Sequence, residues 1–450
     1  MKKILSVLLL ILLVGVVGLL SFLFFFKFEG KSPVVESLSL PQALGKEAKL
    51  AVKIADNRSG LREVSLFLEQ NKKIEKVFEK KYEVDPLWGS PVKEDSFEIT
   101  FSPFKLGFKD GEATLIIRVV DASWRNKLKG NIATYQKKIL LDLTSPHITV
   151  KSSMHYFVPG GSNMVVYSLS EPVVRQGVVV DDLFFKGYPD PQNPNLYYCL
   201  VAVPVQKKQV TRMYIEAQDF AGNKATFPVA FYLKPKKYRR DVINISDRFL
   251  ERKIPEFWNR YPEVPRDNML NAFIYINTEL RKKNNKTIAE IAKSSQIKEF
   301  YGYKFFLRLP KSATRALFGD YRTYYYKGKK IGNAYHLGID LASVAGAPVP
   351  AAATGKVIYA DYLGIYGNSI IIDHGYGLFS LYAHLSGFTV AKGDTVKRGQ
   401  LIGYTDTTGL AGGDHLHFSV LVQGVFVEPL EWFDPNWVKT RIAQKLESIQ

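Results

Sequence analysis

The sequence YHLGIDL, residues 335–341, decides how the C-terminal part of this chain folds. It places His336 and Asp340 four residues apart around a central glycine. Two later sequences, YAHLS at 382–386 and DHLHF at 414–418, contain three more of the seven histidines. Histidine and carboxylate are the usual ligands of a catalytic zinc ion, which takes three protein ligands and leaves a fourth position for water. The three sequences together predict a metal site.

His415 and His417 alternate about one leucine. On a β-strand, this spacing places both imidazoles on one face, with Cα atoms about 6.6 Å apart. Leu416 and Phe418 then point to the opposite, buried face. One histidine is free to bind the metal while the other reaches the substrate.

His336 and Asp340 need a different local structure. On a straight strand, their Cα atoms would lie about 13 Å apart, which is too far to share one ion. Helical spacing would bring them together, but Gly338 and the apolar run after it disfavour a helix. We therefore expect a bend at Gly338, where the absence of a Cβ atom permits unusual torsion angles.

The region from Phe305 to Asp434 has β character. Short strands are expected, separated by regularly placed glycines, at 356–360, 369–373, 378–383 and 400–404. This pattern predicts tight hairpins and a compact antiparallel sheet with the site on its loops. His384 is expected to follow the third of these strands.

Three motifs in this region resemble those of a known family. The pattern His-x-Gly-x-Asp, then Tyr-x-His-Leu, then His-x-His is matched by His336/Gly338/Asp340, Tyr382/His384/Leu385 and His415/His417. Residues 390–403 and the Phe318-Gly319 pair agree as well. The region therefore resembles the lysostaphin/LytM-type zinc metallopeptidases, which are peptidoglycan endopeptidases.

The resemblance implies a role for each matched residue. It implies that His336, Asp340 and His417 bind one Zn²⁺ ion, and that His384 and His415 are catalytic histidines outside the ligand set. It also implies hydrolysis of peptide cross-links in peptidoglycan. There is no His-Glu-x-x-His motif, so no glutamate is placed as the general base. The remaining histidine here, His374, lies outside the motifs and is interpreted as structural.

Two other functions stay open at this point. A catalytically silent member of the family would position or activate another cell-wall hydrolase, although no ligand position is replaced here. Alternatively, Gly393 to Gly399 would form a lipoyl-like hairpin of an efflux adaptor. That reading needs long helical hairpins, which the sequence lacks, and leaves the His-x-His motif unexplained.

The N-terminus carries a long apolar run from Ile4 to Phe26. Its length is sufficient to cross about 30 Å of hydrocarbon as a helix, and it exceeds the core of a cleaved signal peptide. We expect an uncleaved signal-anchor in the inner (cytoplasmic) membrane, with Lys2 and Lys3 in the cytoplasm. The C-terminal domains would then face the periplasm or cell-wall space.

Alternating patterns from Val34 to Leu233 predict two β-sandwich domains. In each, a strand ends in an aspartate that precedes an Asn/Gly loop: Asp121 with Asn126, and Asp219 with Asn223. This pattern resembles bacterial immunoglobulin-like domains, which suggests a spacer or an adhesive module. His147 and His155 fall here without partners in register and are interpreted as ordinary histidines.

The period becomes helical beyond a basic stretch at 234–240. Ser246 is expected to cap one helix and Asp267 a second. The sequence Thr287-Ile-Ala-Glu290 fits a capping box ahead of a short third helix. This region is expected to pack on a neighbouring domain or on membrane phospholipid.

Composition limits the partners. The formal net charge of +18 implies an anionic neighbour, namely nucleic acid, a membrane surface or a cell-wall polymer, unless it serves only solubility. No nucleic-acid-binding signature is present, so no nucleic-acid partner is expected. The single cysteine, Cys199, excludes an internal disulfide and a cysteine-based zinc site, and its apolar surroundings indicate a buried thiol.

The prediction for the whole chain is a mainly β protein with an N-terminal transmembrane helix. The predicted parts are a signal-anchor (1–30), two Ig-like domains (34–145 and 146–233), a basic helical linker (234–300) and a LytM-type peptidase domain (301–437). The expected partners are peptidoglycan, the cytoplasmic membrane and other cell-wall enzymes or regulators.

Overall fold

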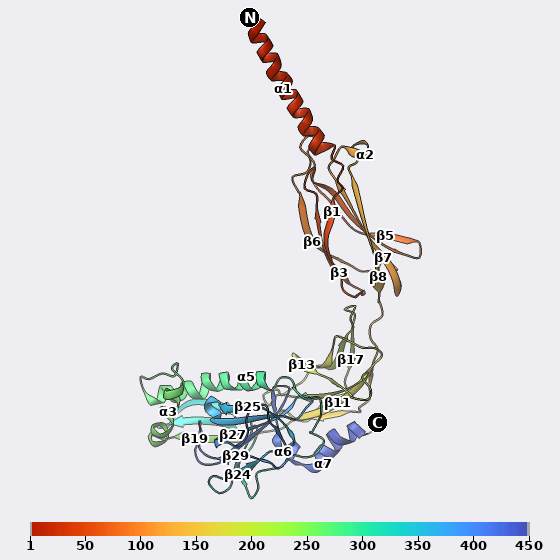
Figure 1. The fold of residues 1–450 in the computed structure, drawn as a ribbon. Helices are drawn as coiled ribbons and strands as arrows, with labels where there is room; N and C mark the ends of the chain where they lie inside the picture. Colours follow the sequence, from red (N-terminus) through yellow and green to blue (C-terminus); the bar gives the residue numbers. More distant parts are fainter. Residues whose placement is uncertain (1, 448–450) are drawn as a thin grey trace. The chain divides into compact units, whose positions relative to one another are not determined.

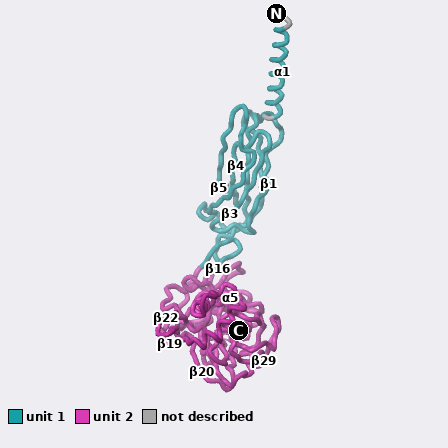
Figure 2. The backbone as a smooth tube through the Cα atoms, turned by 90° about the vertical axis from the view of Figure 1, so that its left-hand side faces the viewer, with its two compact units in different colours: residues 1–146, 218–225 teal, residues 147–217, 226–450 magenta. Residues whose placement is uncertain are grey.

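The computed structural model describes residues 2–447. The chain divides into two compact units, shown in different colours in Figure 2. One unit comprises the residues up to Pro146 together with Gln218–Ala225, and the other comprises His147–Ala217 together with the residues from Thr226 onwards. The fold is mainly β with a helical segment before the C-terminal sheet, as predicted.

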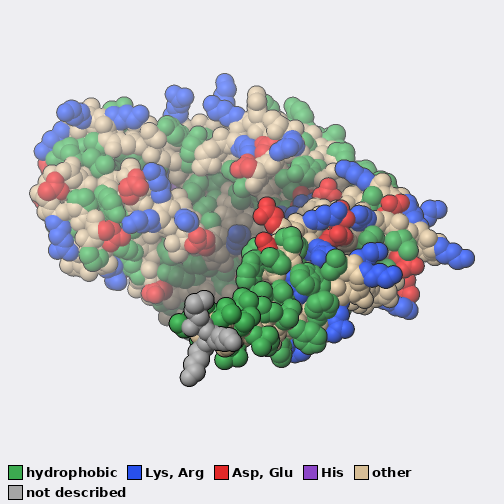
Figure 3. All heavy atoms as spheres, turned by 90° about the horizontal axis from the view of Figure 1, so that it is seen from above, with side chains coloured by type: hydrophobic (Ala, Val, Ile, Leu, Met, Phe, Trp, Pro, Cys, Tyr) green, Lys and Arg blue, Asp and Glu red, His purple; other side chains and the backbone are tan. Residues whose placement is uncertain are grey.

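The first unit begins with the long helix α1 (Lys2–Lys27). Its segment Ile4–Phe25 has a mean hydropathy of 3.1 and is not buried by the rest of the chain. In Figure 3, which views the chain from its N-terminal end, hydrophobic side chains form a patch in the foreground. By length and composition, this is the one helix among the described residues that is suited to crossing a membrane.

The first β domain is a sandwich of two sheets, with strand orders β1-β3-β6 and β2-β8-β7-β4-β5. Inward-facing residues of both sheets, such as Val52, Ile99, Leu66 and Ile117, form one core because alternate side chains of a strand share a face. The strands are β1 (Val34–Ser39), β2 (Ala43–Leu44), β3 (Ala48–Ala55), β4 (Leu61–Gln70), β5 (Lys73–Lys81), β6 (Glu94–Phe101), β7 (Gly111–Asp121) and β8 (Ile132–Leu141); the short helix α2 spans Arg125–Leu128.

The repeated aspartates each hold a loop. Asp121 accepts hydrogen bonds from the backbone and side chain of Asn131 at 2.7 and 2.8 Å. Asp219 binds Asn223 in the same way, with both distances 2.8 Å. Asn126, the asparagine noted in the loop after Asp121, donates from its side chain to the Gly130 carbonyl. The partner of Asp121 therefore lies at the far end of the loop.

The second β domain has two four-stranded sheets, β14-β15-β11-β9 and β13-β12-β16-β17, and a parallel pair β10-β18. Cys199 is buried and its thiol donates to the Phe185 carbonyl, as predicted for a structural thiol. His155 is also buried, between Ser152 and the Ala230 carbonyl. The strands are β9 (Ile148–Val150), β10 (His155–Phe157), β11 (Ser162–Leu169), β12 (Arg175–Val180), β13 (Leu183–Lys186), β14 (Tyr188–Pro189), β15 (Leu196–Ala202), β16 (Met213–Gln218), β17 (Lys224–Pro228) and β18 (Phe231–Leu233).

A helical segment leads into the C-terminal sheet. Strand β19 (Arg240–Ile245) pairs in parallel with β21, and it is followed by α3 (Asp247–Arg260), α4 (Met269–Tyr275), a π-helical turn (Ile276–Leu280) and α5 (Arg281–Ile291). Ser246 caps α3 as predicted, since its hydroxyl accepts from the Phe249 amide at 3.2 Å.

Two of the predicted helix starts were wrong. Asn268, and not Asp267, caps α4, with its side-chain oxygen 2.8 Å from the Asn271 amide. Thr287 lies inside α5, where its hydroxyl donates to the Lys283 carbonyl. The chain continues from α4 into α5 through the π turn, so the predicted capping box does not begin a third helix.

The C-terminal region forms a ten-stranded sheet whose main order is β20-β23-β30-β27-β26-β25-β28. Helices α3 and α5 run along one side of β25 and β27 (Figure 1), and Ile254 and Phe273 of the helical segment share a core with Phe379 and Leu381 of β27. The strands are β20 (Ala313–Ala316), β21 (Tyr321–Tyr326), β22 (Lys329–Tyr335), β23 (Ile339–Ala342), β24 (Pro348–Pro350), β25 (Gly355–Tyr362), β26 (Asn368–Asp373), β27 (Leu378–Phe388), β28 (Thr395–Val396), β29 (Leu401–Thr405), β30 (Leu416–Val422) and β31 (Val425–Val427), of which β21 and β22 form a separate sheet with β19.

Short helices follow the sheet and contact the second β domain. They are α6 (Pro429–Phe433), α7 (Pro435–Val438), a π-helical turn (Lys439–Ala443) and α8 (Gln444–Glu447). Glu431 accepts hydrogen bonds from the amide and hydroxyl of Ser162 in β11, at 2.9 and 3.2 Å. The Trp432 indole donates to the same hydroxyl. These contacts hold the end of the sheet against β11.

Candidate metal and catalytic site

Three side chains converge where two strands meet. Asp340 of β23 lies directly opposite His417 of β30, and His336 follows the end of β22. His336 Nε2, Asp340 Oδ1 and His417 Nδ1 lie 2.9–3.0 Å from one another. All three residues are buried. The sequence prediction that these residues meet is therefore matched by their positions.

Hydrogen bonds fix which nitrogen of each histidine faces the shared point. His336 Nδ1 lies 2.9 Å from the Leu317 carbonyl, to which only an N–H can bond. His417 Nε2 lies 3.1 Å from the Ser419 hydroxyl. With protons on those outer nitrogens, His336 Nε2 and His417 Nδ1 keep free lone pairs, as metal-binding histidines do.

The two oxygens of Asp340 have different partners. Oδ1 faces the histidines, while Oδ2 accepts a hydrogen bond from Arg322 at 2.9 Å. Burial by itself would raise the pKa of Asp340, but the charge and hydrogen bonds of His336 and its neighbours hold that pKa well below its ordinary value. Asp340 is therefore an ionised carboxylate with one oxygen directed at the shared point.

Gly338 allows this close approach. A Cβ atom at Gly338 would lie 2.6 Å from His417 Nε2 and 2.6 Å from the Phe418 carbonyl. The φ angle of Gly338 is not in the left-handed region. The chain does bend at Gly338, as expected. Left-handed torsion angles are not the reason for the glycine, however, since the close contact with β30 requires it.

Two further histidines lie beside the three convergent groups. The ring centroids of His384 and His415 are 4.9 Å apart, and His415 Nε2 lies 3.5 Å from Asp340 Oδ1. Both Nδ1 atoms are 2.8 Å from carbonyls of the loop 406–413, at Thr408 and Gly413. The Nε2 atoms are therefore left to face the cavity.

His384 lies within β27 and not after a strand as expected. Its φ of 60° is left-handed, and the pairing with β26 shifts register between Tyr382 and Leu385. The extra residue forms a bulge, which turns the side chain of His384 into the site. The sequence gives no signal for this bulge, because it depends on the register with β26.

The environments of these two histidines differ. Burial lowers the pKa of His384 well below its ordinary value, and His415 and His417 lower it further, so His384 is neutral. Burial acts on His415 in the same direction, but hydrogen bonding and attraction from Asp340 outweigh it and raise the pKa of His415. One histidine is suited to accept a proton and the other to donate one.

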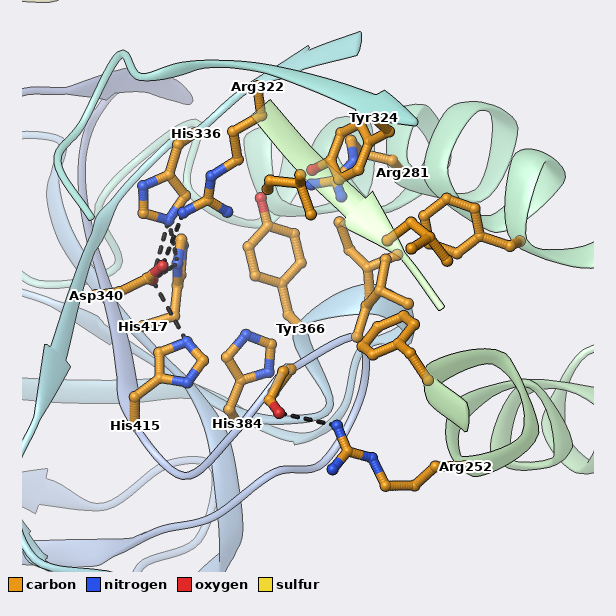
Figure 4. A pocket seen from close by; sticks show the side chains of 18 of the residues that line it. Arg252, Arg281, Arg322, Tyr324, His336, Asp340, Tyr366, His384, His415 and His417 are labelled. Atoms are coloured by element: carbon orange, nitrogen blue, oxygen red, sulfur yellow. Dashed lines mark hydrogen bonds and ion pairs between the residues drawn. The ribbon is translucent and has the colours of Figure 1, made fainter. Parts of the chain in front are cut away.

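All five residues line one cavity of about 550 Å³ (Figure 4). Residues of the helical segment and of β21 form its other wall. The side chains of that wall used below are Phe249, Arg252, Phe273, Arg281, Arg322 and Tyr324. The cavity therefore joins a polar centre to a partly apolar, basic wall.

The donor set fits a zinc ion. Two imidazole nitrogens and one carboxylate oxygen are a common catalytic ligand set, and a tetrahedral ion with bonds near 2.0–2.1 Å spaces its ligands by about 3.3 Å. The three atoms observed at 2.9–3.0 Å need to separate only slightly to reach that spacing. All three residues line the cavity, from which a fourth ligand can reach the ion.

Comparison with known protein families identifies the region that contains these converging residues. Residues 334–429 match the model of peptidase family M23. The C-terminal part of this chain is an M23 peptidase domain. The match begins just before His336 and contains all five converging residues.

Curated relatives match about a fifth to a quarter of this chain. The "DD-carboxypeptidase/endopeptidase Mpg" of Neisseria meningitidis is 42% identical over 95 residues, which are 21% of this chain and 22% of that protein. The "Peptidoglycan DD-endopeptidase ShyB" of Vibrio cholerae is 41% identical over 115 residues, or 26% of each protein. The chain thus spans about a quarter or less of the length of these relatives.

Among solved structures, the catalytic domain of lysostaphin from Staphylococcus simulans is similar to part of this chain. It is 30% identical, with a TM-score of 0.25, and the match covers 28% of this chain and 94% of that chain.

Several residues around the M23 domain's site were missed by sequence reasoning. Arg281 and Arg322 lie outside the matched residues, and the sequence does not show that they reach the cavity. The motif Phe318-Gly319 was noticed, but not the arginine that follows it. His374, interpreted as structural, is buried with its nitrogens bonded to the Thr354 carbonyl and the Ser380 hydroxyl.

The helical segment also holds the loop that orients both outer histidines of the M23 domain. From α3, Arg252 donates to the Gly412 carbonyl at 2.8 Å, and Lys253 donates to the Thr407 carbonyl. Glu256 accepts from the Gly409 amide at 2.8 Å. Since Thr408 and Gly413 fix His384 and His415, α3 acts on the site through this loop.

A second group of acidic side chains occurs in the first β domain. Oxygens of Glu29, Asp56 and Asp121 lie within 4.8 Å of one another and are buried. Amides of Ser59, Arg58 and Asn131 already donate to these oxygens. We interpret this group as part of the loop structure that also contains the Asp121–Asn131 contact.

Proposed function

We propose that this chain is a zinc-dependent endopeptidase that hydrolyses peptide cross-links of peptidoglycan, anchored in the cytoplasmic membrane and facing the cell wall. The observation that carries the proposal is the convergence of five side chains in one cavity. His336, Asp340 and His417 present three ligand atoms to one point, and His384 and His415 stand beside them.

In this proposal, His336 Nε2, Asp340 Oδ1 and His417 Nδ1 hold one zinc ion. When bound, zinc supplies a Lewis acid that polarises a carbonyl and lowers the pKa of water towards about 7. Leu317, Ser419 and Arg322 orient the three ligands through their outer atoms. Such outer contacts keep the ligands in the correct tautomer and direction.

His384 and His415 have separate roles in the proposed reaction. Neutral His384 accepts a proton from the attacking water through Nε2, since its Nδ1 is bonded to the Thr408 carbonyl. His415, whose pKa Asp340 raises, donates a hydrogen bond to the oxygen that becomes negative. Asp340, a proposed zinc ligand, is the one carboxylic side chain among the residues that line the cavity, so no other carboxylate competes for these roles.

Peptidoglycan as substrate is supported by the relatives. The matched M23 domains belong to proteins named as peptidoglycan DD-endopeptidase and DD-carboxypeptidase/endopeptidase. The cavity, at about 550 Å³, has room for a short peptide and has apolar contacts for its side chains. The excess of basic residues suits an anionic cell-wall polymer or membrane surface.

The helix α1 supports the proposed location. Its apolar segment Ile4–Phe25 is long enough to span a bilayer and carries no charged residue. In this arrangement, the β domains stand between the membrane and the M23 domain along the sequence, and other cell-wall enzymes or regulators are candidate partners for them.

The test uses the full chain in mild detergent with purified peptidoglycan. We expect soluble muropeptides to be released, about one zinc per chain, and loss of both in Asp340→Ala. His384→Ala should lose release but keep the zinc, because His384 is outside the ligand set. Release by Asp340→Ala at the parent rate would contradict the proposal.

The same measurements of zinc content and muropeptide release distinguish the enzyme from a catalytically silent scaffold. A scaffold would carry no stoichiometric zinc and would release nothing on its own. All five polar positions of the motifs are present and converge, which favours the enzyme.

A further inference from the structure

The cavity beside the metal-binding residues has a strong excess of positive charge. Four arginines line it, whereas Asp340 is the one acidic residue that does. The four are Arg248, Arg252, Arg281 and Arg322. Of these, only Arg322 has an acidic partner among the described residues, and that partner is Asp340 itself. The surplus guanidinium groups indicate that the cavity receives an anionic group.

Arg322 is incompletely bonded. Its side chain is 18% exposed, one terminal nitrogen donates to Asp340 Oδ2, and its buried Nε has no hydrogen-bond partner in the described part of the chain. An unsatisfied N–H on a largely buried guanidinium costs free energy until an acceptor reaches it. Because Arg322 lines the cavity, an anionic group in the cavity can reach its guanidinium.

Arg281 supplies a second positive charge on the same side. Its Nε and one terminal nitrogen donate only to the neutral Asn277, at 3.2 and 2.7 Å, so its charge is not neutralised. Its charge also acts on Tyr366, whose ring packs 5.5 Å from His417. In Figure 4, Arg281 and Arg322 approach the cavity from the side opposite His384 and His415.

We propose that Arg281 and Arg322 bind a free carboxylate on the substrate residue that contributes the amine of the scissile bond. The planar guanidinium matches a carboxylate with two parallel hydrogen bonds. The residue on the carbonyl side has already used its own α-carboxyl in the scissile bond. The nearest backbone carboxylate that a peptide can offer is therefore on the amine side.

This inference rests on the proposed function, and it narrows the substrate class. The favoured cross-link has a free α-carboxylate next to the bond that is cut. Phe249, Ile243 and Leu410 line the same cavity and contact the apolar parts of that residue. An amidated or peptide-extended residue at this position would leave both arginines without their acceptor.

The test is equilibrium binding of two small peptides, N-acetyl-D-alanyl-D-alanine and its C-terminal carboxamide. The protein is the zinc-loaded full chain in detergent, carrying His384→Ala so that neither peptide is consumed. We expect the free acid to bind about 10- to 100-fold more tightly, as befits a charge-assisted pair in a partly buried site. In Arg281→Gln and Arg322→Gln, this ratio should fall towards one.

The ratio separates recognition from structural damage. A variant that merely loosens the site weakens the binding of both peptides equally and leaves the ratio of their affinities unchanged. Lys282→Gln is the matched control, since Lys282 is the next residue in α5 with its side chain 73% exposed. It removes the same charge without reaching the cavity, and its ratio should stay that of the parent.

Three results would overturn the inference: equal binding of acid and amide, no binding of either, or an unchanged ratio in both arginine variants. Turnover by the chain with His384 intact distinguishes the two proposals. Cleavage of both peptides at similar rates contradicts the carboxylate site alone. No release of muropeptides from peptidoglycan, with the binding preference retained, contradicts the endopeptidase and leaves the carboxylate site supported.

Discussion

The cavity has two walls of different origin. We call residues 334–429 the catalytic wall, because they include the three converging ligand atoms and the two outer histidines. We call the lining residues within 240–326 the helical wall, and apart from Asn244 and Ser246 its side chains are arginines, aromatics and aliphatics. The catalytic wall coincides with the residues that match the model of peptidase family M23, whereas the helical wall lies outside that match.

The difference separates chemistry from recognition. Residues on paired strands hold atoms at fixed short distances, as β23 and β30 do for Asp340 and His417. The helical wall contributes no ligand atom, but it supplies the charge and apolar surface next to them. We infer that the catalytic wall determines what reaction occurs and that the helical wall determines which peptide is accepted.

The largest expected effect comes from replacing His384 in the catalytic wall. His384→Ala should lower the rate of peptidoglycan hydrolysis by about 10²- to 10⁴-fold, the usual contribution of a general base. Zinc content should not change. The control is His147→Ala, which removes an exposed histidine of the second β domain and should leave hydrolysis at the parent rate. Equal rates for His384→Ala and the parent would contradict the assigned role.

Gly338→Ala tests the close packing of the catalytic wall. The added Cβ would lie 2.6 Å from His417 Nε2 and from the Phe418 carbonyl, so β23 and β30 must separate. We expect a loss of about 1–3 kcal/mol in the free energy of unfolding, as for other overpacked sites, together with weaker zinc binding. Gly387→Ala is the control, because nothing lies within 4 Å of its Cβ position. A wild-type zinc affinity in Gly338→Ala would refute the packing argument.

The catalytic wall was largely predictable from sequence, because its signals are local. The alternation of side chains along a strand is enough to place both histidines of His-x-His on one face. The three motifs together contain all five converging residues. The reason given for Gly338 was wrong, since the atom that a side chain would meet belongs to His417, about eighty residues later. Spacing along one segment cannot show a contact with another.

The sequence predicted helices in the helical wall, but it did not predict that these residues line the cavity. The cap at Ser246 was correct because it depends on a few adjacent residues. Arg281 and Arg322 reach the cavity only because β19 pairs with β21 and the helices pack on the sheet, which are long-range contacts. The bulge at His384 is equally invisible, since it arises from register with β26.

Glu256→Ala tests whether the helical wall also supports catalysis. Glu256 accepts hydrogen bonds from the Gly409 amide and the Tyr362 hydroxyl, at 2.8 and 2.9 Å. Removing it leaves both donors unsatisfied, at a cost of about 1–3 kcal/mol of stability. Because the loop 406–413 holds His384 and His415, the turnover number should also fall, by several-fold. Faster hydrogen exchange of that loop would show the cause.

Glu256→Gln is the matched variant, since a glutamine oxygen still accepts from Gly409. It should keep most of the stability and turnover that Glu256→Ala loses. If both variants behave like the parent, Glu256 does not position the loop.

The smallest expected effect concerns the far flank of the M23 domain, where Glu431 contacts Ser162. Burial raises the pKa of Glu431 to about 8, although hydrogen bonds from Ser162 oppose the rise. The ordinary value is 4.5, so the folded protein binds more protons than the unfolded chain between about pH 4.5 and 8. The stabilisation from protonated Glu431 is therefore complete below pH 4.5 and is lost as pH rises through 8.

Glu431→Gln removes this dependence, because glutamine stays neutral and still accepts from Ser162. Relative to the parent, the variant should gain on the order of 1–3 kcal/mol in the free energy of unfolding between pH 5 and pH 8. Denaturant unfolding of both proteins at each pH measures the difference. Glu290→Gln, at an exposed side chain on α5, should show no such gain. A parallel pH profile for parent and Glu431→Gln would mean that Glu431 is ionised in the folded protein, and Lys236 beside Glu428 would then be the cation that stabilises it.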